Sequence, residues 1–125
     1  MIMYHCTALP FLEEILKTGL KPKKPFSFVH RNKKIDPIEG VYLSKHPFIW
    51  MYNSTLFSTH GGVLIELDIN GIELFPDHIA DIETKMKNEN FFVKEPIPTS
   101  RFIKIWTSTA EAPNSFKELK WKRIK

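Results

Sequence analysis

The chain has 125 residues, of which 42% are hydrophobic and 26% charged, and its formal net charge is +4. This size and composition are typical of one globular domain and exclude disordered and collagen-like chains. The single cysteine, Cys6, excludes an internal disulfide and a cysteine-cluster zinc site, and it favours a reducing cytoplasm. No apolar run approaches the roughly 20 residues of a membrane span, and the first residues do not have the pattern of a secretory signal. We therefore expect a single cytoplasmic domain over residues 1–125, without membrane contact.

The positive charge is concentrated in two segments, Lys21 to Lys34 and Lys117 to Lys125. Together they hold 11 of the 18 basic residues and one of the 14 acidic residues. The second lies within a basic C-terminal segment over residues 113–125. Such asymmetry indicates contact with a polyanion, although charged loops and tails are as often simply solvated. The sequence leaves both interpretations open.

The first predicted elements are a strand and a helix. Residues 1–6 form a short apolar strand. Pro10 suits the first turn of a helix, and apolar residues recur with helical spacing through Leu16. Gly19 predicts the end of this helix. Residues 20–39 are rich in proline and lysine, so we expect a long loop in which only residues 26–29 could form a strand.

The middle of the chain predicts a strand, a helix and a second strand. Residues 40–44 have the pattern of a strand, and residues 47–57 that of a helix. The next strand, over residues 63–69, is the clearest in the sequence. Its odd-numbered positions are apolar and face one side, whereas residues 64, 66 and 68 face the other.

The remaining elements complete an α+β fold. Asn70-Gly71 is a type I′ turn dipeptide, which predicts a hairpin leading into residues 72–75. Pro76-Asp77 begins a short helical turn. Two further strands are expected over residues 91–93 and 102–106.

Three places in the chain carry candidate functional side chains. His5 lies at the end of the first strand, where it could hold a sugar hydroxyl or serve a structural role. Tyr42 and Tyr52 are separated by nine residues, so a strand followed by a helix would bring both rings to one slot suited to a planar heterocycle. Glu89 precedes a buried strand, and Glu95 is the competing carboxylate. The other four histidines have no metal-binding spacing, and no metal is expected.

Taken in order, several segments resemble the ADP-ribosyltransferase fold, across the chain from Tyr4 to about Ile105. The resemblance is strongest to the diphtheria-toxin-like branch, which has His, Tyr and Glu on three separate elements and a second tyrosine further on. The segments are Tyr4-His5-Cys6-Thr7, Ile15 to Pro22, Gly40-Val41-Tyr42-Leu43-Ser44, Val63 to Asp68, Glu89-Asn90-Phe91-Phe92-Val93, Ile97-Pro98 and Phe102-Ile103.

The resemblance implies two small packed antiparallel sheets around an NAD cleft, with short helices. It implies that NAD is the substrate and that ADP-ribose is transferred to an intracellular protein or nucleic acid. The implied catalytic residues are Glu89, Tyr42 and His5. The implied NAD-binding residues are His5, for the adenosine ribose; Cys6 and Thr7, for the nicotinamide amide; and Tyr42, Ser44 and Tyr52, with the two tyrosines enclosing the nicotinamide ring.

Two departures from the family pattern narrow this expectation. Arginine-modifying members carry Glu or Gln two residues before the catalytic Glu, and Lys87 stands there instead. The arginine and paired histidines of the related RNA 2′-phosphotransferases have no match near His5 or Tyr42. An enzyme of that type remains an alternative because of the basic segments, as does an inactive module of this fold that binds nucleic acid or protein.

Overall fold

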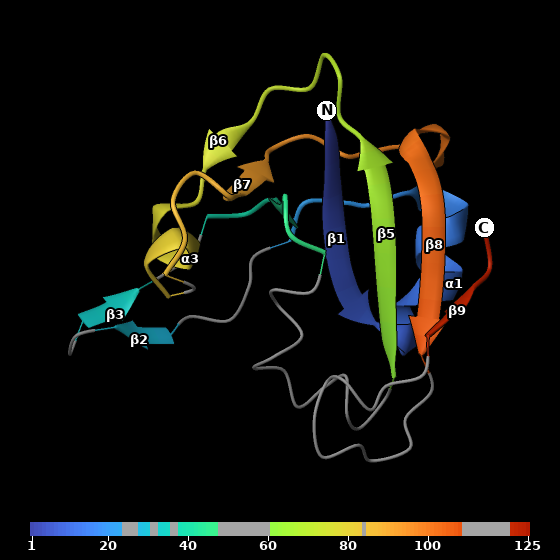
Figure 1. Cartoon of the computed structure of the whole chain (residues 1–125), viewed down its shortest axis with the longest axis horizontal. Coiled ribbons are helices and arrows are strands. Elements are labelled where there is room, and N and C mark those ends of the chain that lie inside the picture. The colour runs from blue at the N-terminus through green and yellow to red at the C-terminus, as the bar shows by residue number, and fades with distance from the viewer. Residues whose placement is uncertain (24–27, 31–32, 36–37, 48–60, 84, 109–120) are drawn as a thin grey trace.

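The computed structural model describes residues 1–23, 28–30, 33–35, 38–47, 61–83, 85–108 and 121–125 (Figure 1). Seven strands form one antiparallel sheet in the order β6-β7-β4-β1-β5-β8-β9, and β2 pairs with β3 separately. The strands are β1 (Ile2–Ala8), β2 (Phe28–His30), β3 (Lys33–Ile35), β4 (Val41–Ser44), β5 (Gly62–Asp68), β6 (Phe75–Pro76), β7 (Asn90–Val93), β8 (Phe102–Ser108) and β9 (Trp121–Arg123). The helices are η1 (Leu9–Phe11), α1 (Leu12–Thr18), α3 (His78–Glu83) and η3 (Thr99–Arg101). The expected α+β class is confirmed.

The seven-stranded sheet has the fewest paired residues between β1 and β4. Every residue of β1 has a register partner on β5, and every residue of β4 has one on β7, but β1 and β4 share only the pair Tyr4–Ser44. The strands β6, β7 and β4 therefore form one part of the sheet, and β1, β5, β8 and β9 form the other. In Figure 1 the long strands β1, β5 and β8 run side by side, while β6 and β7 lie apart from them. This continuous sheet replaces the expected two packed sheets, because the Tyr4–Ser44 pair joins the halves.

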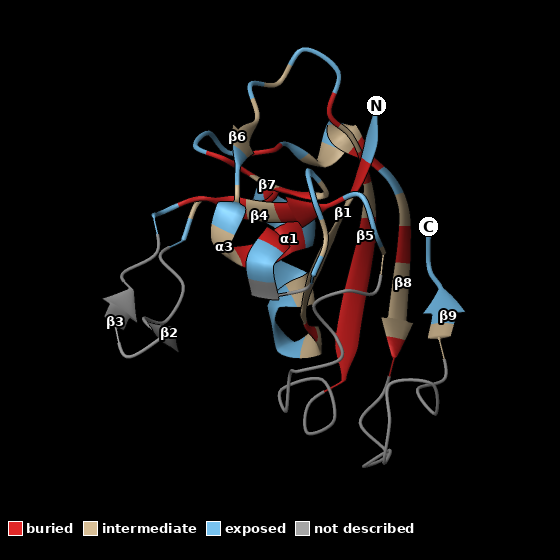
Figure 2. Cartoon of the chain, turned by 60° about the vertical axis from the view of Figure 1, so that its left-hand side comes forward, coloured by how far each residue is buried: buried red, intermediate tan, exposed pale blue. Residues whose placement is uncertain are grey.

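The main hydrophobic core lies on one face of this sheet, and β5 is its centre. β5 is bordered by β1 and β8, and Figure 2 shows it mostly buried. Val63, Ile65 and Leu67 belong to the core cluster, whereas Leu64 packs on the opposite face with Trp106 and other side chains. The predicted alternation of β5 is confirmed. The other buried members of the core cluster are Met3, Ile15, Leu20, Val41, Leu43, Ile69, Val93, Ile97, Phe102 and Ile105.

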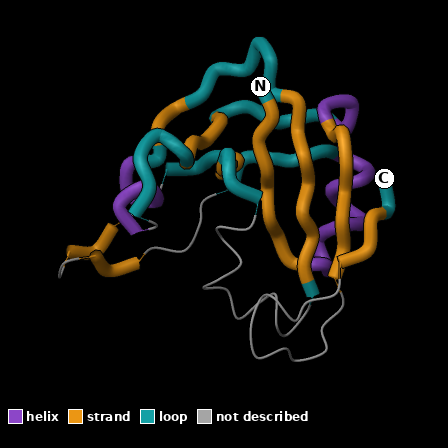
Figure 3. The backbone as a smooth tube through the Cα atoms, in the orientation of Figure 1, coloured by secondary structure: helices purple, strands orange, loops and turns teal. Residues whose placement is uncertain are grey.

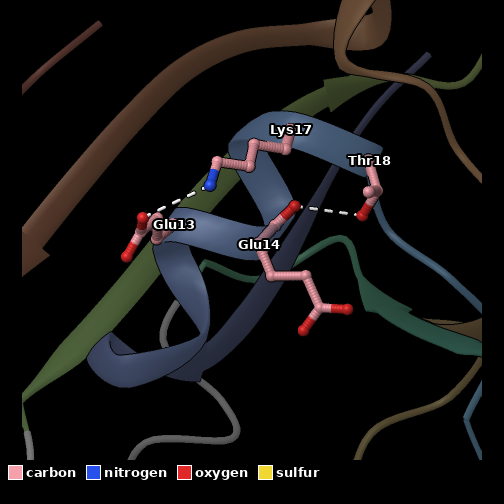
Figure 4. A network of polar contacts seen from close by, with 4 residues as sticks. All are labelled: Glu13, Glu14, Lys17 and Thr18. Atoms are coloured by element: carbon pink, nitrogen blue, oxygen red, sulfur yellow. Dashed lines mark hydrogen bonds and ion pairs between the residues drawn. The ribbon is translucent and has the colours of Figure 1, made fainter.

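Helix α1 covers the core face and ends where the sequence predicts. Ile15 is its buried residue, and the Gly19 N–H donates to the Ile15 carbonyl at 2.8 Å, with Gly19 at φ +77°. Its outer side is polar (Figure 4). The Lys17 ammonium lies 3.4 Å from the Glu13 carboxylate, and the Thr18 hydroxyl donates to the backbone carbonyl of Glu14 at 3.0 Å. The helix is therefore amphipathic: Ile15 and the partly buried Leu12 pack against the core, whereas the solvated side carries the polar residues and the exposed Leu16.

The predicted hairpin after β5 is wrong. Asn70 and Gly71 do form a turn, but residues 72–74 are not a strand, and β6 pairs with β7 instead. Figure 3 shows the connection from β5 to β6 as a loop that arches over to the other part of the sheet. A hairpin partner had no place beside β5, because β1 and β8 already occupy both of its edges.

Further segments bear on the predicted elements. β2 overlaps the possible strand over residues 26–29, whereas β3 lies in the predicted loop and β9 was not predicted. Of the helix expected over residues 47–57, all but the first residue lies outside the described part of the chain. The short helix after Pro76-Asp77 is confirmed as α3, at whose start the Ala80 N–H donates to the Asp77 carboxylate at 3.1 Å. Within the described ranges, no helix has the length and hydropathy needed to cross a membrane.

Candidate functional site

The three residues expected to be catalytic lie on or beside three neighbouring strands. His5 is on β1 and Tyr42 on β4, and Glu89 immediately precedes β7. Because the strand order runs β7-β4-β1, the fold brings these distant parts of the sequence together. The single register pair between β1 and β4, Tyr4–Ser44, lies among these residues. His5 directly follows Tyr4 on β1.

His5 connects β1 to β4 through its side chain. Its Nδ1 lies 2.8 Å from the Tyr42 carbonyl oxygen. A carbonyl can only accept, so Nδ1 carries the proton of this hydrogen bond and Nε2 of the neutral ring keeps a lone pair. Burial lowers the pKa of His5, the hydrogen bond to Tyr42 opposes this, and the charge of Lys23 lowers it further. His5 is thus neutral at pH 7, with an Nε2 that can accept a hydrogen bond from a hydroxyl group.

Tyr42 belongs to a row of aromatic rings that crosses β4, β7 and β6. Its ring stacks on Phe92 with the centroids 5.5 Å apart, and Phe92 stacks on Phe75 at the same separation. The hydroxyl of Tyr42 donates to the Ile38 carbonyl. Burial and the nearby Asp77 raise the pKa of Tyr42, while the hydrogen bond to Ile38 opposes the rise. The ring is held firmly and only partly covered; Tyr52, its predicted partner, lies outside the described residues.

The predicted side chains do not share one face of the sheet. Val41 and Leu43 enter the core, so strand alternation places Tyr42 and Ser44 on the opposite face. His5 shares the core side of β1 with Met3. Ser44 is completely buried, and its hydroxyl accepts the His46 N–H at 3.0 Å. A ligand that contacts both His5 and Tyr42 must therefore lie where β1 and β4 separate.

The backbone of residues 5–7 has one side free of β4. These residues pair with β5, but β1 pairs with β4 only at Tyr4. Successive residues of a strand direct their backbone N–H and C=O groups to alternate sides. Some of the groups at Cys6 and Thr7 therefore face the separation between the strands, where an amide could bind.

The Cys6 side chain is part of the packing on the other face. Its Sγ donates to the Pro47 carbonyl at 3.3 Å, and burial raises the pKa of the thiol to about 12. The thiolate is the reactive form, so we expect alkylation of native Cys6 by iodoacetamide at pH 8 to be about 10³-fold slower than in the denatured chain. Mass spectrometry of timed samples measures both rates, and equal rates would contradict this burial.

Glu89 is held by hydrogen bonds through its backbone. Its N–H donates to the Asp81 carboxylate at 3.2 Å, and its carbonyl accepts the Lys45 N–H at 2.9 Å. Among the described residues, its carboxylate has no hydrogen-bond or ion-pair partner. Glu95 lies in the exposed turn beyond the other end of β7. Asp81 was not identified from the sequence, because no local pattern around an acid in a short helix reveals its contacts with residues 88–90.

The side chain of Lys23 provides a positive charge near the candidate site. Lys23 exchanges two backbone hydrogen bonds with Gly40, at 3.0 and 3.1 Å, and its ammonium lies 4.8 Å from the centre of the Phe11 ring. It is thus held between the start of β4 and the segment that follows β1, and its charge acts on His5. Such a cation can attract an anionic ligand. In the described ranges, no three His, Cys, Asp or Glu side chains are grouped so that they could hold a metal ion.

The two basic segments contribute residues to the strands β3 and β9 in the part of the chain that the structure describes. β3, which contains Lys33 and Lys34, and β9, which contains Lys122 and Arg123, lie at opposite ends of the molecule (Figure 1). Trp121 of β9 packs against the cluster around Leu64. Contact of one polyanion with both β3 and β9 would require a ligand that reaches across the domain.

Comparisons with protein-family models, with curated proteins and with solved structures find no match for this chain. Functional inference therefore depends on the residues and geometry of the chain itself.

Proposed function

We propose that the chain is an NAD-dependent mono-ADP-ribosyltransferase that acts on an intracellular macromolecule. The observation that carries the proposal is the adjacency of β7, β4 and β1, which brings the backbones of Glu89, Tyr42 and His5 to one region, with the Tyr42 ring on the opposite face of the sheet from His5. The sequence motifs resemble those of this enzyme family in the same order. The hydrogen bond between His5 and the Tyr42 carbonyl, at 2.8 Å, supports a common site.

In the proposed reaction, the bond between the nicotinamide nitrogen and the ribose carbon breaks. Its electron pair leaves with nicotinamide, which is a neutral molecule and needs no protonation. Positive charge then develops on the ribose, as in glycoside hydrolysis. The Glu89 carboxylate stabilises this charge, while an acceptor nucleophile attacks the ribose carbon and loses its proton to solvent. The acceptor thereby receives ADP-ribose. Because one bond breaks and the other forms heterolytically, the reaction needs no redox step.

Each other residue has a binding role in this proposal. His5 accepts a hydrogen bond from a ribose hydroxyl through Nε2, and backbone groups at Cys6 and Thr7 hold the nicotinamide amide. Tyr42 stacks on the nicotinamide ring, whose positive charge adds a cation–π attraction. The ammonium of Lys23 attracts the diphosphate in this proposal. The first test is to incubate the full chain with NAD, with and without cell extract, and to measure the released nicotinamide by chromatography.

Tyr42→Ala is expected to weaken NAD binding about tenfold or more. The substitution removes stacking worth about 0.5–1.5 kcal/mol and the apolar contact area of the ring. Tyr42→Phe is the matched control, because it keeps the ring and removes only the hydroxyl that bonds Ile38. Calorimetric titration with NAD measures both dissociation constants. If Tyr42→Ala lowered the Tm but left the Kd unchanged, Tyr42 would have only the packing role seen in its contact with Phe92.

A further inference from the structure

The carboxylate of Asp81 accepts hydrogen bonds from the start of β7 and from the residues just before it. Oδ1 accepts the Glu89 N–H at 3.2 Å, the Asn90 N–H at 3.0 Å and the Asn90 side-chain amide at 2.9 Å. Oδ2 accepts the Asn88 N–H at 3.1 Å. Four donors therefore converge on one side chain, and three of them are consecutive backbone N–H groups.

These contacts explain how an ionised acid is tolerated at a buried position. Asp81 is only 8% exposed. Burial by itself raises the pKa of the carboxyl, but the hydrogen bonds from residues 88–90 outweigh it and lower the pKa below its ordinary value. A carboxyl with a lower pKa in the folded than in the unfolded chain stabilises the fold at neutral pH, and this stabilisation is lost as the pH falls through the folded-state pKa. Asp81 is therefore charged under physiological conditions.

The turn held by Asp81 contains two residues with positive φ. Lys85 and Asn88 adopt φ values of +55° and +58°, a conformation that asparagine tolerates better than lysine does. The backbone carbonyl of Asp81 also accepts the Met86 N–H at 2.9 Å. The backbone and side chain of Asp81 together thus accept hydrogen bonds from Met86 and from residues 88–90.

We propose that Asp81 is the positioning residue for the Glu89 carboxylate, an inference that rests on the proposed function. Asp81 holds the N–H of Glu89, and the Lys45 N–H holds its C=O. These two contacts fix the backbone on both sides of the Glu89 Cα, and hence the direction in which its side chain leaves the strand. A group that stabilises charge only in the transition state must be held within about 0.5 Å of its productive position. The four donors on Asp81 supply that restraint, while the carboxylate of Glu89 has no hydrogen-bond or ion-pair partner among the described residues.

The test is the substitution Asp81→Asn in the full chain, with steady-state rates of nicotinamide release. We expect kcat to fall about 10- to 100-fold, while the KM for NAD changes less than about threefold, because Asp81 does not contact the substrate. Asp77→Asn is the matched control. It removes the same charge at the start of the same helix, but the Asp77 carboxylate bonds Ala80 and not residues 88–90.

A double-mutant cycle separates positioning from a general structural role. In the Glu89→Gln background, Asp81→Asn should cause no further loss of kcat, since there is no catalytic carboxylate left to position. Additive losses, or an Asp81→Asn enzyme with normal kcat, would overturn the inference. Asn90→Ala removes only one of the four donors, so it should lower kcat in the same direction by a smaller factor even if Asp81→Asn does not fold. Lack of nicotinamide release by the unmodified chain would instead overturn the proposed function itself, and with it this role for Asp81.

Discussion

Glu89→Gln is expected to reduce nicotinamide release by at least about 10²-fold and to leave the fold intact. The amide has nearly the shape of the carboxylate but lacks the negative charge that stabilises the developing cation. The contacts of Glu89 with Asp81 and Lys45 use backbone atoms, which the substitution does not change. Because the side chain is partly exposed and has no partner among the described residues, the free energy of unfolding should change by less than about 0.5 kcal/mol.

The measurement uses labelled NAD and cell extract, with Glu95→Gln as the matched control for the same chemical change at an exposed position. Label that becomes sensitive to protease identifies a protein acceptor, and label that becomes sensitive to nuclease identifies a nucleic acid. Free labelled ADP-ribose indicates that NAD is hydrolysed. Loss of activity in Glu95→Gln but not in Glu89→Gln would move the catalytic role to Glu95. Full activity in both variants would remove the carboxylate from the mechanism.

Gly19→Ala is expected to be the most damaging of the small substitutions considered, with about 3 kcal/mol of lost stability and a Tm lower by ~10 °C. Gly19 has φ +77°, which an L-amino acid occupies at a cost. An added Cβ would also lie 2.4 Å from the carbonyl oxygen of Ile97. That carbonyl accepts the Leu20 N–H at 2.8 Å, so it cannot move without breaking the bridge that closes α1 onto the segment before β8.

Gly71→Ala separates the two causes. Gly71 has φ +78°, but nothing lies within 4 Å of an added Cβ. This variant therefore reports the backbone cost alone, about 1–2 kcal/mol. Denaturant unfolding of both variants gives the comparison. Equal losses of stability would show that the Ile97 contact has no energetic weight.

The sequence determined those elements whose signals are local. Gly19 ended α1 because glycine readily occupies the left-handed region, and the strict alternation of β5 predicted which residues enter the core. Both features depend on near neighbours in the chain, and for that reason they could be predicted from the sequence. His5, Tyr42 and Glu89 are not distinctive one by one; they were selected by the order of several segments, and their roles stay predictions.

Only the tertiary structure decided how these elements combine. Asn70-Gly71 has the local chemistry of a hairpin, yet β6 pairs with β7, because both edges of β5 are taken by strands from distant parts of the chain. The single Tyr4–Ser44 pair, the bond from His5 to the Tyr42 carbonyl and the four donors on Asp81 likewise join residues that no sequence period relates. Local conformational preference determined the pieces of this protein, whereas competition for strand edges and for buried hydrogen bonds determined their arrangement.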